Sequence, residues 1–261
     1  MTTVAVIPAR YGSTRFPGKP LAKETGKYLI QHVYEHVCES ARIDRVIVAT
    51  DDERIVAAVT SFGGEARLTN SDHPSGTDRV GEVAASLNLS ADDLVLNVQG
   101  DEPEISAAVL DRLIDSMFAD SNDCRIGTLA APFADDGPTS GPGSPLDPNC
   151  VKVVVDNDGR ALYFSRSLIP FPKATGGAVE KPSRWLHHLG VYAFRADALQ
   201  NICQAQARNG DTLDRIESLE QLRWLACGWP MTVTIVEHRF VGVDTPEDYA
   251  AFIRRMPAHA G

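Results

Sequence analysis

The segment VAVIPARYGSTRFPGKPLA occupies residues 4–22 and joins two contrasting pieces of chain. Val4–Ile7 is apolar and predicts a short buried strand, whereas the loop after it carries Arg10, Arg15 and Lys19 and no acid. The whole chain is acidic, with 35 Asp and Glu against 25 Lys and Arg. A cationic loop directly after a strand, in an acidic protein, predicts a local binding site for an anion.

Strand-like and helix-like patterns alternate through the first half of the chain. The expected strands are Val4–Ile7, Val46–Ala49, Glu65–Leu68 and Leu94–Val98, and the expected helices are Leu29–Ser40, Glu53–Phe62, Asp78–Leu87 and Ala107–Phe118. This alternation is typical of an α/β fold with a mostly parallel sheet and helices on both faces. Ligands of such sheets bind beyond the carboxyl ends of the strands, which predicts a functional edge at loops 8–20, 50–52 and 99–104.

The second half is less regular and predicts an antiparallel elaboration of the same sheet. Residues 135–149 are rich in Pro and Gly and predict an exposed loop. The expected strands are Val151–Val155, His188–Phe194 and Thr232–Val236, and the expected helices are Ala196–Gln204, Leu213–Cys227 and Pro246–Arg255. We therefore expect a single domain over residues 1–261 and not two independent ones.

Composition excludes several classes of protein. A net charge of −10 argues against general binding to nucleic acid or to anionic membranes, since the long-range field would repel both. The five cysteines form no C-x-x-C pair and their number is odd, which favours neither a disulfide framework nor a zinc site. No apolar run approaches the roughly 18 residues of a membrane-spanning helix. These features together predict a cytoplasmic protein.

The cationic loop does not match the common phosphate-binding motifs. Gly12 and Gly18 have the wrong spacing for a Walker A loop, Pro20 stands where that motif has Ser or Thr, and there is no G-x-G-x-x-G. A glycine-bearing strand-to-helix loop with three cations nevertheless suits a polyphosphate, which needs backbone N–H groups and fixed positive charge. The alternative is a solvated loop whose cations pair with surface acids.

Two carboxylates follow strand-like runs and predict a metal site. Asp101 lies in VLNVQGDEP (95–103), and Asp244 lies in VGVDTPEDY (241–249). Carboxylates beside a polyphosphate suit Mg²⁺, which is usually held by one or two of them together with phosphate oxygens. The competing explanation, an acid at a helix start, fits Glu102 and Glu104 better. Asp248 has a sufficient structural explanation as the third residue of a capping box.

Two segments of the second half could form a pocket. In LHHLGVYAFR (186–195), strand alternation places His188 and Tyr192 on one face with Gly190, opposite an apolar face. A half-buried strand with a hydrogen-bonded histidine is an equal alternative. In LDRIESLEQLRWLACG (213–228), helical spacing predicts an apolar stripe of Ile216, Leu219, Leu222 and Ala226 beside the polar Glu217, Glu220 and Gln221. A solvated face is the commoner role for such polar residues.

Several of these segments occur together in a known family. IPARYGSTRFPGKPL, HPSGTDRVGEV, LNVQGDEP, RWLHHLGVYAFR, IESLEQLRWL and GVDTPEDY appear in the order found in 3-deoxy-manno-octulosonate cytidylyltransferases, the CMP-Kdo synthetases, where Kdo is 3-deoxy-manno-octulosonate. The chain resembles this family from about residue 4 to about residue 253. The resemblance implies a Rossmann-like nucleotide-diphospho-sugar transferase fold, and transfer of CMP from CTP to Kdo with release of pyrophosphate. It also implies a Mg²⁺ cofactor, a homodimer and a role in lipopolysaccharide synthesis.

The resemblance also implies roles for particular residues. Residues up to about 125 would bind mainly the nucleotide, and about 150–245 the sugar acid and a second subunit. The catalytic group would be Arg10, Lys19 and Asp101. The nucleotide-binding group would be Arg10, Ser13, Arg15, Lys19, Ser75, Gly76, Thr77 and Gln99. The sugar-acid group would be Gln99, Arg166, His188, Tyr192, Glu217 and Gln221. The metal ligands would be Asp101 and Asp244.

Two other functions remain open from the sequence. A cytidylyltransferase for a related sugar acid, of the 8-amino-Kdo or sialic acid type, would carry much the same motifs. A non-catalytic nucleotide sensor would keep the cationic loop but would not need both Asp101 and Asp244. Turnover with a panel of sugar acids distinguishes the first alternative from a Kdo cytidylyltransferase. Release of pyrophosphate distinguishes an enzyme from the second alternative.

Overall fold

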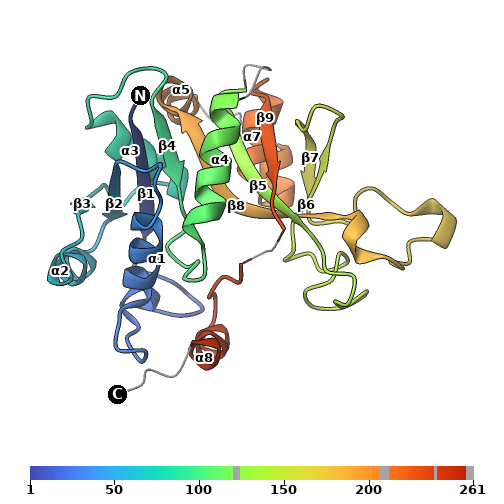
Figure 1. Ribbon diagram of the computed structural model, residues 1–261, viewed down its shortest axis with the longest axis horizontal. Coiled ribbons are helices and arrows are strands. Elements are labelled where there is room, and N and C mark those ends of the chain that lie inside the picture. Colours follow the sequence, from blue (N-terminus) through green and yellow to red (C-terminus); the bar gives the residue numbers. More distant parts are fainter. Residues whose placement is uncertain (120–123, 206–211, 238–239, 257–261) are drawn as a thin grey trace. The chain divides into compact units, whose positions relative to one another are not determined.

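The computed structural model describes residues 1–119, 124–205, 212–237 and 240–256. The chain forms two units, Met1–Asp111 with Phe240–Gly261 (unit 1) and Arg112–Arg239 (unit 2). Figure 1 shows their helices and strands, coloured along the sequence. The prediction of a single domain concerns how the two units are joined, and it stays a prediction.

Unit 1 contains four parallel strands in the order β3, β2, β1, β4. They are β1 (Thr3–Ala9), β2 (Arg45–Thr50), β3 (Ala66–Leu68) and β4 (Leu94–Asn97). Strand β1 lies between β2 and β4, and Ala5, Val6 and Ile7 are fully buried, which accounts for the apolar run that opens the sequence. The predicted parallel sheet is confirmed, with all four strands at the expected places.

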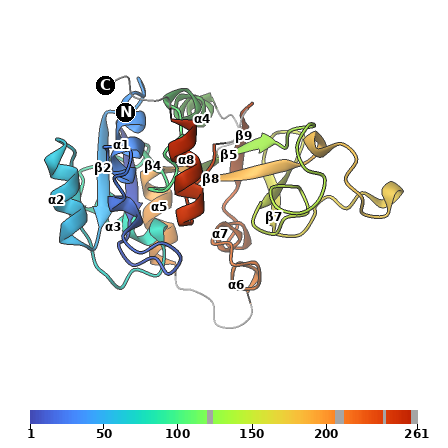
Figure 2. The same ribbon diagram turned by 90° about the horizontal axis from the view of Figure 1, so that it is seen from below.

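The helices of unit 1 also follow the prediction closely. They are α1 (Leu29–Cys38), α2 (Glu53–Ser61), α3 (Gly76–Ala85) and α8 (Pro246–Arg255), and α4 (Ala107–Ala119) crosses the boundary between the units. Figure 2 shows α1, α2 and α3 beside the strands of this unit. Helix α3 begins two residues earlier than predicted because the Ser75 side chain caps it, accepting from the backbone N–H of Asp78. The predicted capping box at the start of α8, between Thr245 and Asp248, is confirmed.

Unit 2 is built mainly from antiparallel pairs. Its strands are β5 (Ile126–Pro132), β6 (Lys152–Val155), β7 (Ala161–Ser165), β8 (Leu186–Arg195) and β9 (Met231–Ile235). Strands β5 and β8, β6 and β7, and β6 and β8 pair antiparallel, whereas β5 and β9 pair parallel. The predicted antiparallel elaboration is confirmed. Strands β5 and β7 were not predicted; IGTLAAP is rich in Gly and Ala, which have low strand propensity.

The helix predicted over Leu213–Cys227 is wrong, because the chain forms two short helices there. They are α6 (Leu213–Glu217) and α7 (Gln221–Ala226), and Ser218 between them has a φ of 51° in the left-handed region. The break also removes the predicted apolar stripe, since Ile216 is 69% exposed and Ala226 is exposed. Leu219 and Leu222 are buried, as predicted. Helix α5 (Ala196–Gln204) has the predicted bounds.

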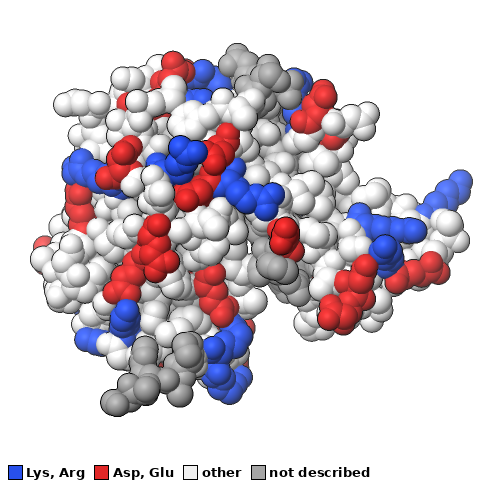
Figure 3. Space-filling model, in the orientation of Figure 1, with Lys and Arg blue, Asp and Glu red and all other residues white. Residues whose placement is uncertain are grey.

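The surface carries both signs of charge. Figure 3 shows acidic and basic side chains interspersed over the face in view. Residues 135–149 contain no helix or strand and are mostly exposed, as predicted, although Ser144 is buried. Across the described part of the chain, no helix combines the length and the apolar character needed to span a membrane.

Candidate nucleotide-binding site

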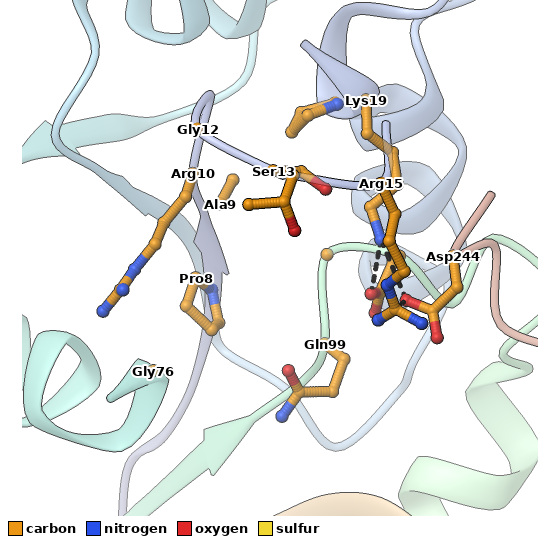
Figure 4. Close-up of a pocket in the computed structure, with 14 residues that line it drawn as sticks. Pro8, Ala9, Arg10, Gly12, Ser13, Arg15, Lys19, Gly76, Gln99 and Asp244 are labelled. Atoms are coloured by element: carbon orange, nitrogen blue, oxygen red, sulfur yellow. Dashed lines mark hydrogen bonds and ion pairs between the residues drawn. The ribbon is translucent and has the colours of Figure 1, made fainter. Parts of the chain in front are cut away.

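A cavity of about 410 Å³ opens at the carboxyl ends of β1 and β4, entirely within unit 1. This volume falls within the roughly 300–1,000 Å³ of small-molecule sites. Its lining combines the cationic loop, the start of α3, the loop after β4 and the segment before α8 (Figure 4): Pro8, Ala9, Arg10, Gly12, Ser13, Thr14, Arg15, Lys19, Pro20, Gly76, Gln99, Gly100, Asp101 and Asp244. Loops 8–20 and 99–104 therefore form the functional edge that the strand pattern predicts.

The loop after β4 approaches the end of strand β1 closely at Gly100. A Cβ atom on Gly100 would lie 2.8 Å from the carbonyl oxygen of Pro8 and 3.3 Å from Cδ1 of Ile30. Any larger residue would push this loop away from β1, because backbone oxygen cannot move aside cheaply. The glycine thus sets Gln99 and Asp101 beside the cationic loop.

Lys19 is the best-anchored cation of the loop. Its Nζ lies 2.7 Å from Asp101 Oδ2 and 2.7 Å from the carbonyl oxygen of Val243. The same atom lies 3.6 Å from Asp244 Oδ1. The Lys19 side chain is only 12% exposed, so these partners offset the cost of removing the ammonium from water. One ammonium therefore gathers two carboxylates that are far apart in the sequence.

Arg10 and Arg15 are held more loosely. Arg15 Nη2 lies 3.0 Å from Asp244 Oδ1, and its side chain is 64% exposed. Arg10 Nη2 donates to the carbonyl oxygen of His73 at 2.7 Å. Figure 4 shows Arg10 extending away from Arg15 and Asp244. Exposed pairs of this kind contribute no more than about 1 kcal/mol, so either guanidinium can exchange its partner for a phosphate.

The cationic loop contains no acid, but acids from other parts of the chain contact its cations in the folded structure. Asp101 and Asp244 reach Lys19 and Arg15 from other elements of unit 1. The alternative explanation, in which the cations pair with acids, is thus correct for the pairing of Lys19 and Arg15, whereas Arg10 donates to the carbonyl oxygen of His73. The acids themselves line the cavity, so the pairing lies inside the pocket and is not a solvated surface feature.

Glu102 was not predicted as part of the site. Its Oε2 atom is buried and, among the described residues, has no hydrogen-bond partner. Burial raises the pKa of Glu102 well above its ordinary value, and the nearby negative charges of Asp101 and Asp244 raise it further. A shift in this direction favours the neutral form of the carboxyl. It does not act as a helix-start acid, since α4 begins only at Ala107.

Four further residues of the predicted nucleotide-binding group divide into two pairs. Gly76 and Gln99 line the cavity. Ser75 caps α3 and donates to Asp78 Oδ2 at 2.7 Å, and Thr77 is buried with its hydroxyl accepting from Asn97 at 3.2 Å. These two side chains hold the start of α3 in place, and neither is among the lining residues.

Loop 50–52, which the strand pattern also placed at the functional edge, does not line the cavity. Asp51 Oδ2 accepts from the fully buried Arg79 at 2.8 Å. Asp52 is the N-cap of α2. Both acids therefore have partners within the fold of unit 1.

In unit 2, the structure brings Arg166 and Glu217 together. The Glu217 carboxylate accepts from Ser165 Oγ at 2.6 Å and from the backbone N–H of Arg166 at 2.9 Å. The Arg166 guanidinium donates to the carbonyl oxygens of Glu217, Pro148 and Ser218 at 2.6, 3.0 and 3.2 Å. These bonds tie β7 to the turn between α6 and α7 and to the end of loop 135–149.

His188 and Tyr192 share one face of β8, as the alternation predicts, and they lie in an aromatic cluster. The centroid of the His188 ring lies 4.8 Å from that of Phe164 and 5.5 Å from that of Tyr192. The ring centroids of Tyr192 and Trp224 lie 5.0 Å apart. His188 and Tyr192 are 7% and 4% exposed. Gln221, at the start of α7, is buried as well.

The protonation state of His188 follows from its surroundings. Burial lowers the pKa of His188 to about 3, with a smaller contribution from His187, so the ring is neutral at physiological pH. The Thr128 hydroxyl donates to the carbonyl of Val191 at 2.8 Å, so Nε2 of His188 donates to that hydroxyl at 3.0 Å. Nδ1 is left as an acceptor, and any interaction with a ligand would be a hydrogen bond without charge.

The donor set at Asp101 and Asp244 fits a magnesium ion. Both carboxylates approach the same ammonium, and both are partly exposed to the cavity. Within the described ranges, no group of three or more His, Cys, Asp and Glu side chains is arranged to hold a metal. Mg²⁺ is commonly held by one or two carboxylates together with substrate phosphates, so two ligands beside a phosphate-binding loop suit it.

A family model described as cytidylyltransferase matches residues 4–232, and the fold and pocket above define a nucleotidyltransferase of that class. A 3-deoxy-manno-octulosonate cytidylyltransferase of Syntrophobacter fumaroxidans is 46% identical, covering 97% of this chain and 96% of its own. An 8-amino-3,8-dideoxy-manno-octulosonate cytidylyltransferase of Shewanella pealeana is 42% identical, covering 95% and 96%. The chain belongs to the 3-deoxy-manno-octulosonate cytidylyltransferase family.

A solved structure supports the same assignment. The structure of CMP:2-keto-3-deoxy-manno-octonic acid synthetase complexed with CTP has a TM-score of 0.85 and 40% identity to this chain. The match covers 97% of this chain and 98% of the other. The predicted fold and family are therefore confirmed.

Replacing Glu102 with Gln should stabilise the metal-free protein at neutral pH. Near pH 4 and below, the wild-type carboxyl is protonated in both folded and unfolded chains, so the two proteins should unfold alike. Above that, only the unfolded wild type releases the proton, and the advantage of the variant should grow by up to about 1.4 kcal/mol per pH unit until the raised folded pKa is reached.

Urea unfolding at several pH values between 4 and 8 measures this difference. Glu104→Gln is the matched control, because Glu104 forms an ion pair with Arg255 and should lose stability instead. A wild-type protein that is as stable as Glu102→Gln at pH 8 would show that Glu102 ionises freely in the folded state.

Proposed function

We propose that this chain transfers CMP from CTP to Kdo, forming CMP-Kdo and releasing pyrophosphate. The observation that carries the proposal is the cavity of unit 1, which three cations and two carboxylates line at the carboxyl ends of parallel strands. Family membership over nearly the whole chain supplies the substrate class. Arrangements of this kind act on phosphate esters chiefly by positioning and by neutralising charge.

The cations would bind the triphosphate and stabilise the leaving group. Arg10, Arg15 and Lys19 line one cavity, and pyrophosphate is the product that leaves with the most negative charge. Charge-assisted hydrogen bonds from guanidinium and ammonium groups suit phosphate oxygens. Ser13 lies in the same loop and adds a hydroxyl donor. The start of α3 at Gly76, with Ser75 and Thr77 supporting it, would face the cytosine and ribose.

Asp101 and Asp244 would hold Mg²⁺. When bound, the ion supplies neutralisation of phosphate charge beyond what the three cations provide. Without it, Lys19 keeps the two carboxylates together and limits their mutual repulsion. Asp101 also fixes the segment before α8, because its carbonyl oxygen accepts from the backbone N–H of Val243 at 2.8 Å.

The sugar acid would be recognised by side chains of unit 2, namely Arg166, His188, Tyr192, Glu217 and Gln221. His188 offers a neutral acceptor nitrogen, and Glu217 offers carboxylate oxygens; both suit the hydroxyl groups of a sugar. The buried aromatic cluster around His188 would keep its ring in a fixed orientation.

The biological setting is part of the same proposal. CMP-Kdo would serve lipopolysaccharide synthesis, and the enzyme would work as a cytoplasmic homodimer. None of the five cysteines forms a disulfide within the described part of the chain, in keeping with a reducing compartment. The dimer and the pathway rest on family membership.

A related sugar acid is the second candidate substrate. The Shewanella pealeana relative, whose name specifies 8-amino-3,8-dideoxy-manno-octulosonate, is nearly as similar to this chain as the Kdo enzymes. The two acids differ only in an amino group in place of a hydroxyl. The pocket residues named above are compatible with either acceptor, so the choice falls to experiment.

Pyrophosphate release with a panel of substrates tests the proposal. Turnover should be fastest with CTP and Kdo, and slower with UTP because a carbonyl acceptor replaces the cytosine amino donor. An unsatisfied buried polar group costs about 1–3 kcal/mol, or roughly five- to 150-fold. A preference for 8-amino-3,8-dideoxy-manno-octulosonate or for a sialic acid would identify that compound as the acceptor substrate. No release with any acceptor would leave only a nucleotide sensor.

Asp101→Asn should abolish most of the activity without unfolding the protein. The change keeps the size of the side chain and removes the charge that would hold Mg²⁺ against the triphosphate. Loss of several kcal/mol of transition-state stabilisation corresponds to a roughly thousandfold fall in kcat. CTP should still bind through the cations.

Steady-state kinetics with Mg²⁺, together with thermal unfolding, measures both expectations. Asp136→Asn, which changes an exposed carboxylate in loop 135–149, is the control and should keep full activity. A folded Asp101→Asn protein with near-normal kcat would remove Asp101 from the proposed metal site.

A further inference from the structure

The cationic loop is closed upon itself by Tyr11. The carbonyl oxygen of Tyr11 accepts from the backbone N–H of Ser13 and of Gly18, each at 3.0 Å. Within the loop, the Ser13 hydroxyl accepts from the N–H of Phe16 at 3.2 Å. Phe16 packs against the buried cluster of Leu29, Val243, Tyr249 and Phe252, with its ring centroid 5.8 Å from that of Tyr249. The other residues between Tyr11 and Gly18 are exposed or half-buried, so their conformation depends on Phe16 and on the contacts at the ends of the loop.

The side chain of Tyr11 makes a second contact between the two ends of the loop. Gly18 has a φ of 71°, and a Cβ atom there would lie 3.2 Å from Cε2 and 3.3 Å from Cζ of Tyr11. The ring thus covers the α-carbon of Gly18 directly. Glycine serves two purposes at this position, since it adopts the left-handed conformation and leaves room for the ring.

Arg54 packs on the same ring from helix α2. The Cζ atom of its guanidinium lies 3.4 Å from the centroid of the Tyr11 ring. Asp52 fixes that guanidinium with two hydrogen bonds, from Nε at 2.9 Å and from Nη2 at 2.6 Å. Asp52 is itself the N-cap of α2 and accepts from the backbone N–H of Arg54 at 2.9 Å. A regular helix therefore anchors the ring that closes the loop.

We propose that Tyr11 and Arg54 are positioning residues that hold the cationic loop in the conformation that binds the triphosphate. This inference rests on the proposed function for its ligand. Neither side chain is among the residues that line the cavity, so neither acts on the nucleotide directly. Their stacking limits the conformations of the loop before CTP arrives. Loosening it lowers the fraction of protein that is ready to bind, and the apparent affinity falls in proportion.

The test variants are Tyr11→Leu, which removes the ring, and Arg54→Gln, which removes the guanidinium from an exposed position. Tyr11→Phe keeps the ring and should behave as wild type. Arg45→Gln is the matched control, because Arg45 makes the same two-bond fork with Glu65, at 2.8 and 2.7 Å, at the opposite end of β2. Thermal unfolding identifies any variant that fails to fold. If Tyr11→Leu fails to fold, the variant Arg54→Gln, which changes an exposed side chain, tests the proposal.

Two measurements follow for each variant. Hydrogen exchange of the amides in residues 11–19, without substrate, should become about tenfold faster in Tyr11→Leu and Arg54→Gln. The KM for CTP should rise about tenfold in both, equivalent to ~1.4 kcal/mol, while kcat at saturating CTP stays near wild type. Tyr11→Phe and Arg45→Gln should change neither quantity.

Unchanged exchange in Tyr11→Leu and Arg54→Gln would overturn the proposal, as would a fall in kcat with KM for CTP unaltered. The exchange experiment needs no substrate and no turnover. A wild-type chain that is inactive with CTP and Kdo would therefore contradict the proposed function, while the exchange rates would still decide whether Tyr11 and Arg54 order the loop.

Discussion

The ammonium of Lys19 joins three segments of unit 1 that are widely separated in the sequence. It contacts Asp101 after β4, and Val243 and Asp244 before α8, and it belongs to the loop after β1. A nearly buried lysine needs such partners, and two carboxylates brought close together need a cation. Each side of the arrangement therefore depends on the other. The cavity exists because these segments are held at one edge of the sheet.

This mutual dependence explains how an acidic protein can offer a site to a polyanion. The carboxylates that pair with the loop also balance its charge while the site is empty of ligand. The exposed Arg10 and Arg15 have weak partners that phosphate oxygens can replace, whereas the nearly buried Lys19 keeps its geometry. Burial raises the pKa of the Glu102 carboxyl next to this group, which disfavours a further negative charge there.

The sequence was most informative where local rules and parallel-sheet topology decide the outcome. The strands of unit 1, the capping box of α8 and the convergence of Lys19, Asp101 and Asp244 all follow from such rules. Features that depend on tertiary packing were not predictable. The left-handed conformation of Ser218 splits a helix that spacing alone makes continuous. The burial of Glu102 and the stacking of Arg54 on Tyr11 leave no pattern in the sequence. Strand β5 was missed because Gly and Ala carry little strand propensity.

The central claim is that the cavity of unit 1 binds the triphosphate through the loop cations. Calorimetric titration of the wild-type chain with CTP, CMP and cytidine tests it most directly, because the three ligands share a base and ribose and differ only in phosphate. The affinity should fall by more than about tenfold, or ~1.4 kcal/mol, from CTP to CMP, and again from CMP to cytidine. Equal affinity for cytidine and CTP would contradict it.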